Sequence, residues 1–258
     1  MARPIVLVPL AVLSTAGLVS CSMYLEANGG DRGPTVTQER EVSDVAALDF
    51  DASGDVVLSV GEPSLTLTGG ENVLDDLTVE VQGDTLVIDL ANGWHSPGRI
   101  TYDLTLPDLS SIRLSGSGSV TGEAAGSGSR ALDLSGSGRI ELDGLDAQEL
   151  DVSVKGSGEV VVTQVLAVGT SVVIDGSGHV RLAGESDRLT VRIPGSGDVD
   201  AGDLTAQDVV AAVGGSGSID LRAEHTLDAS VDGSGTITYS GGAAVRTSVS
   251  GSGRVAER

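Results

Sequence analysis

Residues 131–142, Ala-Leu-Asp-Leu-Ser-Gly-Ser-Gly-Arg-Ile-Glu-Leu, contain the pattern that decides the fold. The first five and the last four residues alternate apolar and polar side chains, which is typical of β-strands with one buried and one solvated face. Gly136-Ser137-Gly138 separates the two runs, and glycine permits a sharp corner there. The segment therefore predicts a strand, a corner and a second strand.

The Gly-Ser-Gly tripeptide recurs along the second half of the chain. Eight copies follow one another at intervals of 18 to 20 residues, and a fixed period of this size is the signature of a solenoid. Each unit repeats the alternating runs and a polar turn, such as that at residues 143–148. A further copy at residues 126–128 lies midway between the first two. The glycines expected to form structural corners are Gly116, Gly118, Gly136, Gly138, Gly156, Gly158, Gly176, Gly178, Gly195, Gly197, Gly215, Gly217, Gly233, Gly235, Gly251 and Gly253.

Burial of the apolar face explains why such units must coil. An isolated two-stranded unit is marginal in water, whereas coiling lets each strand pair with its counterpart one turn later, about 4.8 Å away. The composition fits a narrow interior of small branched side chains, with 37 glycines, 40% hydrophobic residues and only 2% aromatic residues. The sequence predicts an all-β protein containing a parallel β-helix-like solenoid.

Residues 41–114 keep the alternating strands but lack the tripeptide. Within them, residues 48–58 form a degenerate copy of the repeat, residues 82–84 predict a hairpin turn, and Pro107 predicts the end of a strand. Repeat arrays need atypical ends. We therefore expect an N-terminal β subdomain or cap at 41–114, of more antiparallel character, followed by the solenoid at 115–258.

The amino terminus has the features of an export signal. Residues 1–20 combine Arg3 with an apolar run too short to span a bilayer, which predicts a signal peptide. Leu18-Val19-Ser20-Cys21 resembles a bacterial lipobox, and Cys21 has no second cysteine to pair with. We expect a lipid on Cys21 to hold the protein at the outer face of the bacterial cell membrane, with residues 21–40 as a flexible tether. The alternatives are a plain signal peptide or an uncleaved anchor.

The charge limits the partners. A formal net charge of -22 with only 15 Lys and Arg excludes nucleic acid and electrostatic docking to anionic lipid. We expect contact with the membrane through the lipid anchor and an unidentified envelope or extracellular protein or glycan as the partner. A Ca²⁺-dependent binding module remains an alternative, since dispersed carboxylates bind Ca²⁺ at millimolar concentrations outside cells.

Catalytic constellations are not apparent in the sequence. Each Gly-Ser-Gly precedes a strand, unlike a phosphate-binding loop or a serine nucleophile elbow, which precede helices. His95, His179 and His225 lie in different units without metal-ligand spacing. We therefore expect no enzyme, no cofactor and no metal site. The alternative is a glycan-active β-helix enzyme, in which outward carboxylates align in a column: Asp133, Asp151 and Asp175.

A loop at residues 92–98 is the single local feature that suggests binding. It places Trp94 beside His95 among turn-forming residues. An exposed aromatic side chain on a loop can stack on a sugar or anchor a protein partner. The other interpretation is that Trp94 covers the apolar end of the first half.

The order of motifs over residues 41–258 resembles the putative auto-transporter adhesin, head GIN domain family of bacterial surface proteins. The motifs that carry this resemblance lie at residues 53–58, 71–75, 83–88 and 104–109, in the serial Gly-Ser-Gly strands, and at 251–255. The resemblance implies an all-β, β-helix-like fold and export to the envelope, and it supplies no catalytic residues. We expect a non-catalytic cell-surface lipoprotein scaffold that acts in adhesion, envelope binding or sensing.

Overall fold

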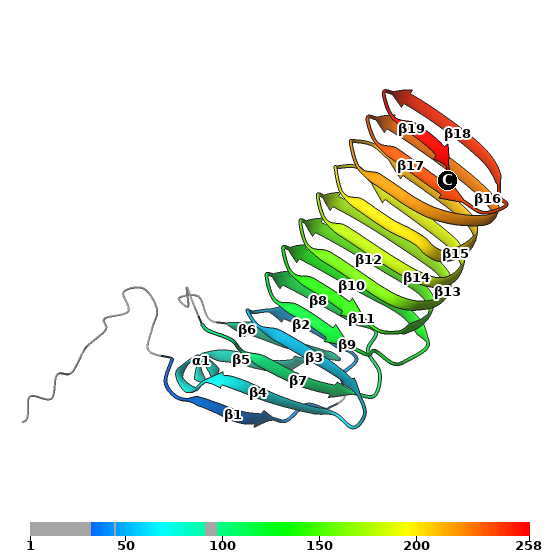
Figure 1. Ribbon diagram of the computed structural model, residues 1–258. Coiled ribbons are helices and arrows are strands. Elements are labelled where there is room, and N and C mark those ends of the chain that lie inside the picture. Colours follow the sequence, from blue (N-terminus) through cyan, green and yellow to red (C-terminus); the bar gives the residue numbers. More distant parts are fainter. Residues whose placement is uncertain (1–31, 44, 91–96) are drawn as a thin grey trace, which may run out of the picture.

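The structure is a computed structural model that describes residues 32–43, 45–90 and 97–258. In these residues the strands join into one continuous sheet that coils into a parallel β-solenoid above an N-terminal cap (Figure 1), which confirms the predicted fold class. The elements before the array are β1 (Thr35–Arg40), β2 (Ala47–Asp51), β3 (Asp55–Val60), β4 (Ser64–Gly70), α1 (Glu71–Asp75), β5 (Leu77–Gln82), β6 (Thr85–Leu90) and β7 (Thr101–Leu106). The array consists of β8 (Ser111–Gly116), β9 (Ser119–Gly122), β10 (Gly128–Gly136), β11 (Arg139–Leu142), β12 (Leu145–Gly156), β13 (Glu159–Gly176), β14 (His179–Ile193), β15 (Asp198–Val213), β16 (Ser218–Gly233), β17 (Thr236–Ser240), β18 (Ala244–Gly251) and β19 (Arg254–Glu257).

The coil has two faces, each a ladder of parallel strands. The first face is formed by β8, β10, β12, the C-terminal parts of β13 to β16, and β18. The second face is formed by β9, β11, the N-terminal parts of β13 to β16, β17 and β19. Alternate side chains of both faces point inward, and these Val, Leu, Ile and Ala residues make one continuous core.

The Gly-Ser-Gly corners join the two faces on one side of the solenoid. Each corner serine donates its backbone N–H to a glycine carbonyl of the preceding corner, as Ser137 does to Gly116 at 2.9 Å. A Cβ atom on Gly138 would lie 2.6 Å from the carbonyl oxygen of Gly118. Gly136 adopts φ +111°, where a side chain is strained. The stacked corners therefore require glycine for both reasons.

The opposite bend differs from the predicted polar turn. A turn at residues 143–144 separates β11 from β12, but in β13 to β16 a single unbroken strand passes around the bend. The inward positions at this bend carry small buried side chains: Ala147, Ala167, Ser186, Ala206 and Ala223. Small side chains leave room for the backbone to curve, and the pairing between the later coils shifts register at or just before this bend.

The amino-terminal strands β2 and β3 form a coil of the solenoid, as the degenerate repeat predicts. β2 pairs in parallel with β8, and β3 with β9. On their other side the same two strands pair in parallel with β6 and β7. The β2–β3 coil thus lies between the coil formed by β6 and β7 and the first coil of the repeat array, formed by β8 and β9.

The N-terminal end of the solenoid is closed by antiparallel strands. β4 pairs with β1 and β7, and β5 forms a hairpin with β6 through the turn at Gly83 (φ +69°). β7 ends at Leu106, directly before Pro107. The short helix α1, which the sequence analysis missed, buries Val73 and Leu74 at this end. The core here also contains an edge-to-face pair of Phe50 and Tyr102, with ring centroids 4.9 Å apart.

Candidate functional site

Two sequence-predicted sites lie outside the described residues. These are the lipidation site at Cys21 and the loop that carries Trp94 and His95. The carbonyl of Arg32 accepts a hydrogen bond from the backbone N–H of Asn72 in α1 at 3.1 Å. Helix α1 lies at the capped end of the solenoid, opposite the C-terminal coil (Figure 1). Among the described ranges, no helix is long and apolar enough to cross a membrane.

The two remaining histidines lie on separate strands and have acidic neighbours. His179, on the second face, stands in register between Glu159 and Asp198 of the adjacent coils. His225, near the bend, has its Nδ1 atom 2.9 Å from Oδ1 of Asp208. In the part of the chain that the structure describes, no three His, Cys, Asp or Glu side chains gather in a metal-binding group.

The predicted column of outward carboxylates is wrong. Coils around β10, β12 and β13 repeat every 20 residues, since Gly136 stands opposite Gly156 and Gly156 opposite Gly176. The three aspartates are 18 and 24 residues apart, so the register separates them. Their partners in an adjacent coil are Ser153 for Asp133, Ser171 for Asp151 and Lys155 for Asp175. None of the three aspartates therefore stands opposite another in the register, and they do not form a column.

The additional Gly-Ser-Gly at residues 126–128 makes room for a buried cation. Arg130 is 5% exposed and donates from Nη1 to Oδ1 of Asp108 at 2.7 Å and to the carbonyl of Leu109 at 2.6 Å. A Cβ on Gly126 would lie 1.7 Å from Nη2 of Arg130. This copy of the tripeptide has a local packing role where the cap joins the array.

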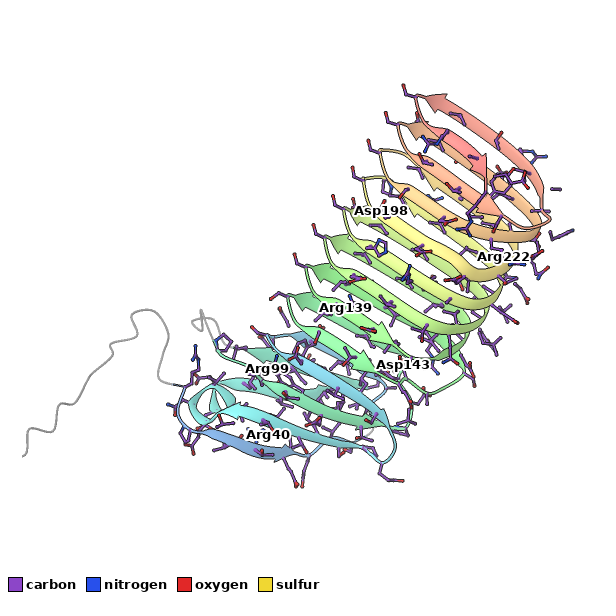
Figure 2. All side chains as sticks on the ribbon, viewed as in Figure 1. Arg40, Arg99, Arg139, Asp143, Asp198 and Arg222 are labelled. Carbon is purple, nitrogen blue, oxygen red and sulfur yellow. The ribbon has the colours of Figure 1, made fainter. Side chains whose placement is uncertain are left out.

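The second face carries rows of charges with alternating sign. Arg139 binds Glu159 of the next coil and Glu141 of its own strand, at 3.0 Å for the latter. Two coils further along, Arg181 binds Asp200 of the coil that follows it. The hydrogen bond from Arg181 holds the pKa of the Asp200 carboxyl below its ordinary value. Figure 2 labels Arg139 and Asp198 on this face, where Glu159 and His179 stand between them in the same register row. These pairs neutralise one another and stabilise the ladder.

The first face carries a groove that crosses four coils. It has a volume of about 520 Å³ and is lined by residues 188–190, 208–210, 226–228 and 244–246. These four segments stand opposite one another in the parallel register of β14, β15, β16 and β18. The groove therefore runs along the solenoid axis and spans roughly 14 Å at the usual spacing of paired strands.

Charged side chains of both signs line the groove. On one wall Arg188 donates a hydrogen bond to Glu149 at 2.8 Å. The two residues are two coils apart, and Gly169, which stands between them in the register, has no side chain to separate them. On the other wall Asp228 and Arg246 approach to 3.9 Å, too far for a hydrogen bond. Val210, which is 51% exposed, stands opposite Asp228 in the register row of this second wall. The groove therefore combines hydrogen-bond donors, acceptors and an apolar surface.

Asp208 is the most constrained acidic side chain of the groove. Its Oδ1 accepts a hydrogen bond from the hydroxyl of Thr226 and contacts Nδ1 of His225. These two partners, Thr226 first, lower the pKa of Asp208. Its Oδ2 atom has no hydrogen-bond partner among the described residues. Asp208 is thus an oriented carboxylate with free acceptor capacity.

Sequence reasoning missed this groove. Its lining residues are spaced by 20, 18 and 18 residues, and each is unremarkable in its own repeat. The signal that could have identified them is the spacing of the corners, because those intervals fix which outward residues of successive coils become neighbours.

Comparison with known proteins relates the chain to a bacterial family. Crystal structures with a similar fold include a putative adhesin from Parabacteroides merdae, with a TM-score of 0.82 and 22% identity, covering 90% of this chain and 98% of the other. Another is a putative lipid binding protein from Parabacteroides distasonis, with a TM-score of 0.77 and 25% identity, covering 90% of this chain and 99% of the other. No curated protein matches the sequence. A family profile matches residues 46–243, which include most of the cap and all but the last coil, so the chain belongs to the family described as putative auto-transporter adhesin, head GIN domain.

Proposed function

We propose that the protein is a lipid-anchored scaffold of the bacterial cell surface that binds an envelope or extracellular partner without catalysing a reaction. The membership in a family named for adhesins is the observation that carries this proposal. The lipobox-like sequence that ends at Cys21 supports the anchor. The predicted tether at residues 21–40 is too long, because residues 35–40 form β1 of the cap. A shorter tether would attach at this capped end and leave the coils to project from the membrane.

The surface chemistry supports binding rather than catalysis. A column of carboxylates on successive coils would favour a glycan-active enzyme, and the register does not stack Asp133, Asp151 and Asp175 in one. The interior is filled by inward side chains along the whole solenoid. One structural neighbour is titled a lipid binding protein, but a filled core favours ligand binding on the outer surface over enclosure of a lipid.

Mass analysis and fractionation test the anchor. The wild-type chain and a Cys21→Ala variant are expressed in a bacterial host, with Ser22→Ala as the matched control. We expect a diacylglyceryl mass on Cys21 and membrane association in the wild type and the control. The variant should be unprocessed or released. Wild-type protein that is free in the medium without a lipid would refute the anchor and favour a diffusible role.

Surface labelling tests the location independently. An epitope tag at the carboxyl terminus should be accessible to antibody on intact cells, because the C-terminal coil lies opposite the tethered end. Labelling that requires cell lysis would contradict display at the surface.

A further inference from the structure

We propose that the groove on the first face binds a neutral, hydroxyl-rich polymer, a linear glycan, that lies parallel to the solenoid axis. This inference rests on the proposed function and names the chemical class of the partner. The groove crosses β14, β15, β16 and β18 in register. A ligand with repeated units along its length can therefore meet equivalent positions on successive coils.

The hydrogen-bonding groups of the groove fit hydroxyls. A hydroxyl donates one hydrogen bond and accepts others, so it needs an acceptor and a donor side by side. Asp208 offers Oδ2 as a free acceptor, held in place by the bonds to Oδ1. Asp228 and Arg246, 3.9 Å apart, offer an acceptor and a donor with space between them. Hydrogen bonds to such ionised groups are roughly twice as strong as those between neutral groups.

The charge of the groove favours a neutral ligand. Two arginines, at 188 and 246, face two aspartates, at 208 and 228. The groove is therefore balanced within a chain of net charge -22, and the surrounding field repels anionic polymers. The exposed side chain of Val210 provides an apolar contact for the C–H surface of a sugar ring.

The backbone geometry argues against an extended peptide in the groove. Peptides that bind to sheets pair with an unpaired strand edge. In the groove, the strands of adjacent coils already pair with one another. A peptide could therefore meet only side chains. A lipid tail is disfavoured because it needs an enclosed apolar cavity, whereas this groove is open and carries four charged side chains.

Three variants test the glycan site in the full-length chain displayed on cells and purified in detergent. D208N/D228N removes the two carboxylate charges while it preserves their shape. Val210→Glu removes the apolar contact, places an additional charge in the groove and leaves the carboxylates intact. Asp175→Asn is the matched control, because it removes an exposed carboxylate of the first face away from the groove. Thermal unfolding of each variant verifies its fold.

The probes are maltohexaose, cellohexaose and laminarihexaose, with polygalacturonate and phosphatidylcholine vesicles as charged-polymer and lipid comparisons. We expect saturable calorimetric binding of at least one neutral hexaose. Both groove variants should weaken it, D208N/D228N by about tenfold or more because charge-assisted hydrogen bonds are lost, and Asp175→Asn should leave it unchanged.

Two results would overturn the glycan site: no binding of any hexaose, or binding that both groove variants retain. Preferential binding of polygalacturonate or of vesicles would also overturn it. Antibody labelling of the same cells separates these results from failure of the proposed function. Displayed protein that binds no hexaose refutes the glycan site alone, whereas absence of labelling refutes surface display.

Discussion

Individual corner glycines differ in how much they resist a side chain. Gly138→Ala should destabilise the protein by about 1–3 kcal/mol, the range for overpacking, because the new Cβ would lie 2.6 Å from the Gly118 carbonyl oxygen and 2.9 Å from Leu114. Gly128→Ala is the matched control, since nothing lies within 4 Å of its added Cβ. Chemical denaturation measures both. Equal stabilities of the two variants would contradict the close stacking of the corners.

Gly126 and Arg130 should behave as a coupled pair. Gly126→Ala is expected to displace the guanidinium, and Arg130→Met removes it together with its bonds to Asp108 and the Leu109 carbonyl. Because both changes remove the same contacts, the double variant should lose less stability than the sum of the single losses, by about 0.5–3 kcal/mol. A double-mutant cycle from denaturant unfolding gives this coupling, and strict additivity would show that Gly126 acts through its backbone alone.

The ion pair between Asp200 and Arg181 makes the stability of the fold depend on pH. Its pKa is depressed in the folded protein by Arg181, so this pair stabilises the fold above the unfolded carboxyl pKa of about 3.9. The stabilisation is lost as the pH falls through the lower folded value. Arg181→Met should raise the pKa of Asp200 toward its ordinary value, as carbon-13 NMR titration can measure. The control is Arg192→Met on the first face, and a matching shift of Asp200 in that variant would contradict the local cause.

Strands near the amino terminus should differ in how slowly their amide hydrogens exchange, according to whether they are paired on one side or on both. β2 and β3 are paired on both sides, whereas β1 and β5 are each paired on one side in the described sheet. We expect amide hydrogen exchange to be slow in β2 and β3, as slow as in β8, and fast in β1 and β5. Exchange of β2 together with β1, in one fast unit, would contradict the insertion of the β2–β3 coil.

The same elements show how far the sequence predicts the structure. The period of the tripeptide and the alternation around residues 131–142 suffice for the coil, the corners and the inward side chains, because both are local properties. The insertion of the β2–β3 coil between β6–β7 and β8–β9 depends on pairing between segments distant in sequence, which no local pattern encodes. The groove and the position of Asp208 depend on register across several coils, where a change from 20 to 18 residues alters which side chains meet.

The whole molecule should tolerate the loss of one complete coil. Deletion of residues 137–156 joins Gly136 to Ser157. The new junction reproduces a normal corner, because Ser157 occupies in its corner the position that Ser137 has after Gly136. We expect a cooperative fold shortened by about one strand spacing, roughly 4.8 Å, as small-angle scattering and thermal unfolding can measure. Deletion of residues 138–156 is the control. This deletion removes an odd number of residues, so the side chains of the following strand that pointed inward would point outward unless the corner is rebuilt. Equal stability of the two deletions would contradict a fixed register.

The direction of the ladder has a mechanical consequence. Since the strands run across the solenoid, the bonds between coils lie along its length, and tension on the C-terminal coil acts on one row at a time. Each coil that peels away releases about 20 residues, or roughly 70 Å of extended chain. A molecule held at its capped end and pulled at the other end thus lengthens in steps under a limited force. Such a solenoid dissipates the work of a shearing flow while its remaining coils stay folded.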